Sequence, residues 1–241
     1  MIAKAIEKII SISGPHIINT AQGSYSDQRL VRIKDDMTAE PIEVRSISAM
    51  VAYIRDVANA IDGINVKSYF VQVVSPTEIK LLSGLNRDRE RECIMVARPE
   101  LPRIPFGQFI DSENMIIALQ SMFMDDNDTK EILAFVGTAT AGTIKEYDDN
   151  GVSQVATVRS GARGKENKIV PSPCTLCPIR TFTEIKQPAS KFIFRLKDGN
   201  GDTVQAALFE ADGGAWRIEA MREIADYLQE QLSDIGMQII G

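Results

Sequence analysis

Histidine and cysteine, two residue types that often act in catalysis, are scarce in this chain of 241 residues. It has a single histidine, His16, in a segment expected to be irregular, which argues against a Ser-His-Asp or Cys-His catalytic arrangement. Its three cysteines, Cys93, Cys174 and Cys177, are too few and too unevenly spaced for a disulfide framework. We therefore expect free thiols and no histidine that acts as a general base.

Long apolar runs are missing as well. The stretch Ile9–Ser13 is interrupted by serines and follows Lys4, Glu7 and Lys8. This pattern fits neither a signal peptide nor a membrane-spanning helix. We expect the protein to stay in the cytoplasm.

An excess of basic charge is also lacking. With 27 lysines and arginines against 33 acidic residues, the net charge is -6, whereas proteins that hold nucleic acid through its phosphates carry a broad basic face. Nucleic-acid binding is therefore not favoured as the main activity, although a local basic segment can still contact phosphate. The 44% hydrophobic content suffices for one large domain or two small ones.

The patterns that are present favour an α+β fold. Residues 1–45 are interpreted as an N-terminal arm, with a short amphipathic helix over 1–10 and an irregular segment or weak strands after it. Residues 46–241 are interpreted as a globular domain of mainly antiparallel sheets, on which a central helix pair and a long C-terminal helix pack. A division of this domain into 46–140 and 141–241 is the alternative.

Periodicity and turn residues predict the individual elements. Apolar spacing from Ser46 predicts a helix that Gly63 ends, and Asp128 with Glu131 predicts a capping box at the start of a later helix. The predicted helices are 46–63, 112–123, 129–135 and 215–233. The predicted strands are 67–74, 77–82 and 91–97 in an antiparallel meander, and two hairpins of 143–147 with 153–159 and of 191–197 with 203–210.

The most basic stretch of the chain, residues 159–168, contains two glycines whose amides can approach a phosphate. The spacing of these glycines excludes a Walker phosphate loop. The stretch is interpreted either as a solvated connection or as a site for an anionic ligand or partner. Together with Arg180, the candidate binding residues are Arg159, Arg163, Lys165 and Lys168.

Cys174 and Cys177 have the two-residue spacing of a zinc knuckle or a redox pair. A structural zinc needs four ligands, and Pro173 and Pro178 favour an extended backbone over the helix N-terminus that redox pairs use. We interpret both as structural thiols and expect no metal and no cofactor. A shared metal and a redox role stay open as alternatives.

Two acidic motifs resemble metal sites only in part. Asp198–Asp202 begins like a calcium loop but lacks the turn glycine and the bidentate glutamate, so a hairpin tip is expected. Glu184 and Lys186 have the E-x-K form of magnesium-dependent nucleases. Charge alternation on an exposed strand is the competing interpretation of that tripeptide.

The stretch Glu210–Trp216 joins the last predicted hairpin to the last helix. Asp212 is expected to cap backbone amides, and Trp216 is expected to anchor the core. Arg180 is expected to pair with Glu184 or Glu210. These residues are interpreted as structural.

A block in the last third of the chain resembles an uncharacterised family of bacteriophage and prophage proteins. It comprises 170–173, 179–182, 187–190, 194–195 and 207–216, and Phe106–Ile110 with Met115–Phe123 extends the likeness over about residues 45–241. The resemblance implies a viral accessory protein, made in the bacterial cytoplasm and encoded among early, replication- or recombination-region genes. It implies no activity and transfers no catalytic residue.

We therefore expect a non-enzymatic binding protein, a homo-oligomer, that engages a host factor or an anionic ligand such as a nucleotide signal. An accessory role in phage DNA replication or recombination is the alternative, suggested by the arginines at 87, 89, 91, 98 and 103. Acidic residues between these arginines argue against a continuous phosphate track. A metal-dependent nuclease is a third and less favoured hypothesis.

Overall fold

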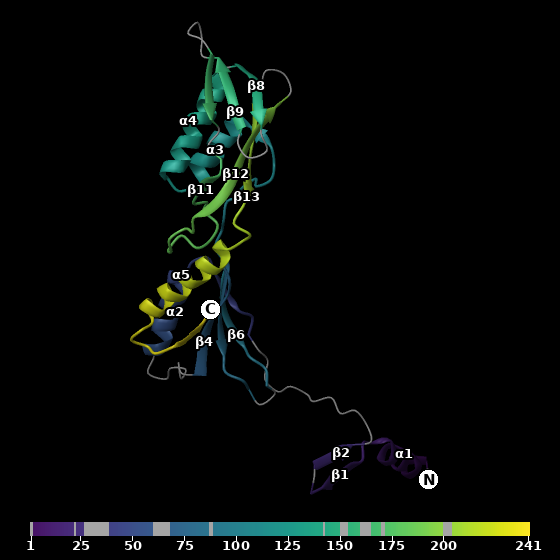
Figure 1. Ribbon diagram of the computed structural model, residues 1–241. Helices are drawn as coiled ribbons and strands as arrows, with labels where there is room; N and C mark the ends of the chain where they lie inside the picture. The colour runs from purple at the N-terminus through teal and green to yellow at the C-terminus, as the bar shows by residue number, and fades with distance from the viewer. Residues whose placement is uncertain are drawn as a thin grey trace. The chain divides into compact units, whose positions relative to one another are not determined.

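The structure, a computed structural model, describes residues 2–21, 23–26, 39–59, 68–86, 89–141, 143–149, 154–159, 165–169, 172–199 and 204–241. The chain divides into two compact units, residues 1–39 and 40–241, which are described one at a time (Figure 1). Helices and mostly antiparallel sheets occur together, so the fold class is α+β, as the sequence predicts.

The N-terminal unit consists of one helix and one hairpin. Helix α1 (Ile2–Ser13) ends three residues later than predicted. Strands β1 (Ile17–Thr20) and β2 (Gly23–Ser26) pair antiparallel and replace the expected irregular segment. No residue of this unit whose exposure the structure describes is buried. Its described part therefore has no hydrophobic core of its own.

The first sheet of residues 40–241 has five strands in the order β14-β4-β5-β6-β3. Strands β4 (Tyr69–Ser75), β5 (Glu78–Ser83) and β6 (Cys93–Ala97) form the antiparallel meander that the sequence predicts. Strands β3 (Ile42–Val44) and β14 (Gln238–Ile240) add a parallel strand at each edge. The sequence predicts neither edge strand, because three residues are too few to show a period of two.

Helices α2 (Ile47–Asn59) and α5 (Trp216–Gln231) pack on one face of this sheet (Figure 1). Side chains alternate between the faces of a strand, and those on the helix-facing side are buried. This core includes Met50, Val71, Ile79, Met95, Ile224 and Leu228. Helix α5 has 16 residues, so the expectation of a long C-terminal helix is not confirmed.

A second sheet has four antiparallel strands in the order β11-β12-β13-β7. These are β11 (Cys174–Leu176), β12 (Ser190–Asp198), β13 (Val204–Glu210) and β7 (Ile110–Asp111). Helices α3 (Ser112–Met122) and α4 (Asn127–Ala141) pack against each other and share a second core with this sheet, which buries Phe192 and Phe194. The predicted helix pair and the predicted β12–β13 hairpin are confirmed.

Helix α4 begins differently from the prediction. The capping box of Asp128 and Glu131 is wrong, because Oδ1 of Asp126 accepts the hydrogen bond from the Thr129 amide at 2.7 Å, the bond that an N-cap residue makes to the third helical residue. Asp128 lies inside the first turn, and its Oδ2 accepts from the amide of Thr175 in β11 at 2.7 Å. Asp126 thus caps the helix, and Asp128 ties it to the sheet.

A third sheet has three antiparallel strands in the order β10-β9-β8. The predicted hairpin is formed by β8 (Thr143–Asp149) and β9 (Gln154–Arg159). The interpretation of residues 159–168 as a loop needs correction, because β10 (Lys165–Ile169) pairs with β9. Four polar residues in five hide this strand from a prediction that relies on β-branched and aromatic content.

Residues 177–190, here called the bridging segment, contact both cores of the larger unit. The Ile179 amide donates to the carbonyl of Met122 at the end of α3, at 2.9 Å, whereas Phe182 and Ile185 are buried in the core beneath α2 and α5. Each core combines residues from before and after position 140. The bridging segment therefore joins the two cores.

Candidate functional site

The predicted binding residues do not all lie together. Arg159 is the last residue of β9 and Lys165 is the first of β10, and the two are register partners. Lys168 lies three residues further along β10 and is paired with Ala156. Arg163 lies outside the described residues. The hairpin formed by β9 and β10 thus brings together Arg159 and Lys165, while Arg180 belongs to the bridging segment.

Arg159 and Lys165 are like-charged residues at directly opposed register positions of β9 and β10. Residues directly opposite each other on antiparallel strands have Cβ atoms about 4.5–5.5 Å apart, and like charges at such positions destabilise the pairing. The other register partner of Arg159 is Thr143 of β8, so neither partner supplies a carboxylate. An anion bound between the two cations would relieve the repulsion.

Arg180 is not a surface cation. The residue is 7% exposed, its Nη1 donates to Oε1 of Glu210 at 2.7 Å, and its Nη2 donates to the Ser190 hydroxyl. Its guanidinium carbon lies 3.9 Å from the centroid of the Trp216 ring. Burial lowers the pKa of Arg180 to about 10, so the group stays protonated at neutral pH. The expected pairing with Glu210 is confirmed, and the expected place among the ligand-binding cations is not supported by this geometry.

Asp212 holds the turn that leads into α5. Its Oδ1 accepts from the Gly214 amide at 2.9 Å, and its Oδ2 accepts from the Ser190 hydroxyl at 2.6 Å. Gly213 and Gly214 have φ values of 64° and 83°, which residues with a side chain rarely adopt. Burial alone would raise the pKa of Asp212, but its hydrogen bonds bring that pKa below the ordinary value. Asp212 thus accepts a backbone amide, as expected, but this amide belongs to the turn, and the N-cap of α5 is Ala215, which makes no side-chain cap bond.

Gln187, which the sequence does not single out, makes four hydrogen bonds inside the bridging segment. Its Oε1 accepts from the amides of Arg180 at 3.1 Å and Thr181 at 3.3 Å. Its Nε2 donates to the carbonyls of Phe182 at 2.9 Å and Ile185 at 3.4 Å. The side chain is buried, so it supplies partners that water cannot supply there. A lone glutamine gives no sequence signal for this role.

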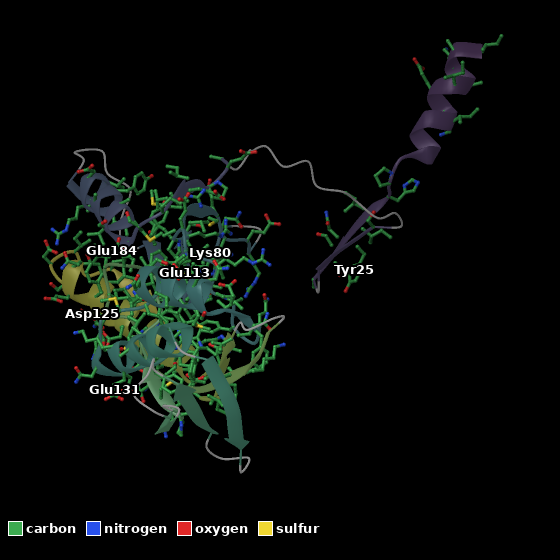
Figure 2. The ribbon with its side chains drawn as sticks, turned by 90° about the horizontal axis from the view of Figure 1, so that it is seen from above. Tyr25, Lys80, Glu113, Asp125, Glu131 and Glu184 are labelled. Carbon is green, nitrogen blue, oxygen red and sulfur yellow. The ribbon has the colours of Figure 1, made fainter. Side chains whose placement is uncertain are left out.

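Glu184 does not occupy the position that a nuclease motif requires. The E-x-K tripeptide lies in a turn and not on a strand. Oε1 of Glu184, labelled in Figure 2, accepts from both the amide and the hydroxyl of Ser48 at 3.2 Å. Ser48 lies in the first turn of α2, where the positive end of the helix dipole stabilises a carboxylate. The prediction that this tripeptide lies on a strand is wrong, and the Glu184 carboxylate contacts the N-terminal end of α2.

All three cysteines are free, as the sequence predicts. Burial raises the pKa of the Cys174 thiol to about 12, and burial together with the nearby Asp126 raises the pKa of Cys177. Both thiols are protonated at neutral pH and are therefore weak nucleophiles and weak ligands. Within the described ranges, no three His, Cys, Asp or Glu side chains are grouped so that they could hold a metal ion.

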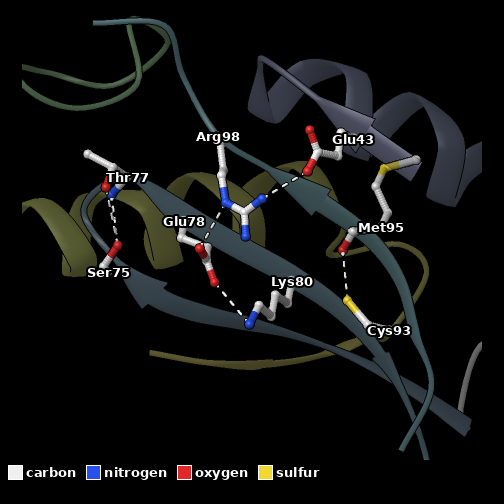
Figure 3. Close-up of polar contacts among 8 residues, drawn as sticks. All are labelled: Glu43, Ser75, Thr77, Glu78, Lys80, Cys93, Met95 and Arg98. Atoms are coloured by element: carbon white, nitrogen blue, oxygen red, sulfur yellow. Dashed lines mark hydrogen bonds and ion pairs between the residues drawn. The ribbon is translucent and has the colours of Figure 1, made fainter. Parts of the chain in front are cut away.

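Two of the arginines that suggested a DNA track, Arg91 and Arg98, are engaged within the protein, whereas Arg87 lies outside the described residues. Figure 3 shows Arg98 between two carboxylates, with Glu43 at 3.0 Å and Glu78 at 2.9 Å. Arg91 lies over the ring of Phe70, 4.8 Å from its centroid, and donates to the carbonyl of Ser83. These contacts leave neither guanidinium as part of a continuous basic strip.

The clefts on the described part of residues 40–241 include two larger ones. One, of about 270 Å³, is mostly apolar and is lined by the bridging segment and Met124. The other, of about 480 Å³, runs beside α3 and is lined in part by Arg103, Phe109, Asn114 and Ile117. Neither cleft contains a residue of the predicted binding set.

The comparisons with known proteins give no relative for this chain. No family model, no curated protein and no solved structure matches it. Among the residues that the structure describes, no helix has both the length and the apolar character needed to cross a bilayer.

Proposed function

We propose that this protein is a non-enzymatic binding protein that engages an anionic ligand, or the acidic surface of a host or phage protein, through the hairpin of β9 and β10. The observation that carries the proposal is the register pairing of Arg159 with Lys165. Two cationic residues lie opposite each other, and neither has an acidic register partner. A bound anion would therefore lower their electrostatic repulsion.

The charge of the whole chain narrows the class of ligand. A net charge of -6 repels a long polyanion, whereas a compact anion responds mainly to charges within a Debye length of about 8–10 Å. A nucleotide phosphate, or a short acidic segment of a protein, fits this pattern better than a nucleic-acid duplex does.

The biological setting is part of the same proposal. The resemblance of residues 45–241 to bacteriophage and prophage proteins supports a phage-encoded accessory protein in the bacterial cytoplasm, acting as a homo-oligomer. In that setting, a binding protein would act by capturing a host factor or an anionic signal.

Calorimetric titration with mono-, di- and triphosphate nucleotides tests the proposal. We expect binding that strengthens with phosphate number, and a loss of at least about tenfold in affinity when Arg159→Gln and Lys165→Gln are combined, since two charge-assisted contacts are removed. The matched control is Lys191→Gln, which neutralises an exposed lysine of β12. Equal affinities for the double variant and the wild type would rule out this site.

The accessory role in DNA replication or recombination is tested in parallel, by titrating single- and double-stranded DNA at several salt concentrations. Binding through phosphates must weaken steeply as salt rises. DNA affinity with such a slope, reduced by the same double variant, would favour the DNA role over capture of a compact anion.

A further inference from the structure

The N-terminal unit carries an apolar surface that no described residue of the unit covers. Six large apolar side chains of α1, β1 and β2 each expose between 51% and 78% of their surface, namely Ile2, Ile6, Ile9, Ile17, Ile18 and Tyr25. Tyr25 is labelled on the hairpin in Figure 2. Apolar residues gathered at this density on a protein surface mark an interaction site.

The unit is too small to hold its structure alone. Domains below about 40 residues usually need a disulfide, a bound metal or assembly with another chain. Residues 1–39 contain no cysteine, and their one histidine, His16, is far short of the four ligands of a structural zinc. An isolated two-stranded hairpin is also marginal in water. Of these three means of stabilisation, assembly with another chain is the one that remains.

The pattern of α1 fits a second copy of itself. Ile2, Ile6 and Ile9 follow one another at spacings of four and then three residues, the spacing that lets two helices interlock along a seam. At 3.6 residues per turn, Lys4 and Lys8 fall on the side of the helix away from this stripe. A helix with an apolar stripe on one side and charged residues on the other can pair with an identical helix through the stripe.

The hairpin extends the apolar surface. Ile17 and Ile18 are neighbours on β1 and therefore point to opposite faces, and both are more than half exposed. Ile18 and its register partner Tyr25 share one of these faces. With the three isoleucines of α1, and at roughly 100 Å² of exposed apolar surface for each of the five side chains, one copy offers roughly 500 Å². Two copies would bury about 1,000 Å², the least that a specific interface needs.

We propose that residues 1–39 are an assembly module, in which α1 pairs with α1 of a second copy through the Ile2, Ile6 and Ile9 stripe. The module stands apart from anion binding by the β9–β10 hairpin, so each can fail without the other. It makes the protein a homo-oligomer and brings two or more of the larger units together.

Sedimentation velocity of the full chain from about 0.5 to 50 µM tests the module. We expect the wild type to exceed the 26.6 kDa of one chain, with a mass that rises with concentration. Ile6→Lys keeps good helix propensity but places a charge in the seam, and should weaken assembly at least tenfold. Lys8→Gln, on the charged side of α1, should leave the mass unchanged.

Cross-linking gives a second, independent readout. Ala5→Cys places a thiol beside the seam, and we expect a disulfide-linked dimer on mild oxidation that is lost when Ile6→Lys is added. A wild type of one-chain mass at 50 µM would overturn the proposal. So would assembly that Ile6→Lys does not weaken, or a monomer whose α1 forms only on anionic vesicles, which would make a bilayer the occupant.

Discussion

The N-terminal unit and the bridging segment reverse the usual relation between polarity and burial. In α1 the large apolar residues Ile2 and Ile9 are among the most exposed of the chain, whereas the polar Arg180, Thr181 and Gln187 of the bridging segment are buried. Each of these three polar side chains makes at least one hydrogen bond within the fold, whereas no residue of the N-terminal unit whose exposure is described is buried. Burial in this protein is therefore decided by the contacts that a segment finds. The segment whose described residues leave their apolar side chains exposed is the one expected to recruit another chain.

The largest effect is expected from breaking the buried ion pair. Arg180→Ala leaves Glu210 and Ser190 without their guanidinium and exposes the face of Trp216. The unfolding free energy should fall by about 3 kcal/mol in urea denaturation, less than for a fully enclosed pair because the Glu210 side chain is 34% exposed.

Arg217→Ala is the matched control. Arg217 is exposed and lies near the same indole ring, 5.2 Å from its centroid. It should lose less than about 1 kcal/mol. Equal losses for the two variants would show that Arg180 contributes only as a surface cation.

A smaller loss is expected from Gln187→Ala. Four hydrogen bonds disappear and leave buried amides and carbonyls without partners, so the unfolding free energy should fall by about 2 kcal/mol. The neighbouring Lys186→Ala changes an exposed side chain and should remain within about 0.5 kcal/mol of wild type. If Gln187→Ala were as stable as Lys186→Ala, water molecules would have to replace the side chain as hydrogen-bond partners of the buried amides and carbonyls.

The contribution of the surface ion pairs of Glu78 is expected to depend on pH. Hydrogen bonds from Lys80 and Arg98 lower the pKa of Glu78 below its ordinary value (Figure 3). A carboxyl with a lowered folded-state pKa stabilises the fold above its unfolded pKa, and this contribution disappears as pH falls through the folded-state pKa. Glu78→Gln should lower Tm by about 2 °C at pH 7, and the difference should shrink toward pH 3.

The check is a series of thermal scans of wild type and Glu78→Gln between pH 7 and pH 3. A difference in Tm that stays constant over that range would mean that the carboxylate charge does not stabilise the sheet.

The smallest effect is expected in the N-terminal unit. Ile18→Thr removes apolar surface that is already exposed, so the main unfolding transition should shift by less than about 0.5 kcal/mol. The same exchange at the fully buried Ile79 of β5 should cost about 2–3 kcal/mol, because it leaves a cavity and buries a hydroxyl. Comparable losses at the two positions would contradict the contrast between the two regions.

Local patterns in the sequence were enough to predict most of the larger elements. The periodicity of α2, the β4–β6 meander and the β12–β13 hairpin follow from residues that are close in sequence, and all three are confirmed. Strand β10 is missed because its polar residues resemble a loop, and β3 and β14 are missed because each is held by a distant strand and not by its own pattern.

The role of the bridging segment lies beyond such reasoning. Glu184 contacts Ser48, 136 residues away, and Thr181 donates to the carbonyl of Pro76, 105 residues away. No local pattern encodes those partners. The pairing of Arg180 with Glu210 was expected from their opposite charges, but the structure places Arg180 in an irregular part of the bridging segment and not on the strand that the expectation assumed. The pairing of Arg159 with Lys165 was not expected, since it depends on the register of a strand that reads as a loop.

Hydrogen exchange of the full chain at two protein concentrations tests the central contrast most directly. The hydrogen-bonded amides of Ile179, Arg180 and Thr181 in the bridging segment should exchange at the rate set by global unfolding and show no concentration dependence. Amides of α1 should be protected at about 50 µM and lose most of that protection at about 0.5 µM, since mass action links their order to assembly. Protection of α1 that is the same at both concentrations would mean that α1 is ordered without assembly, against the expectation.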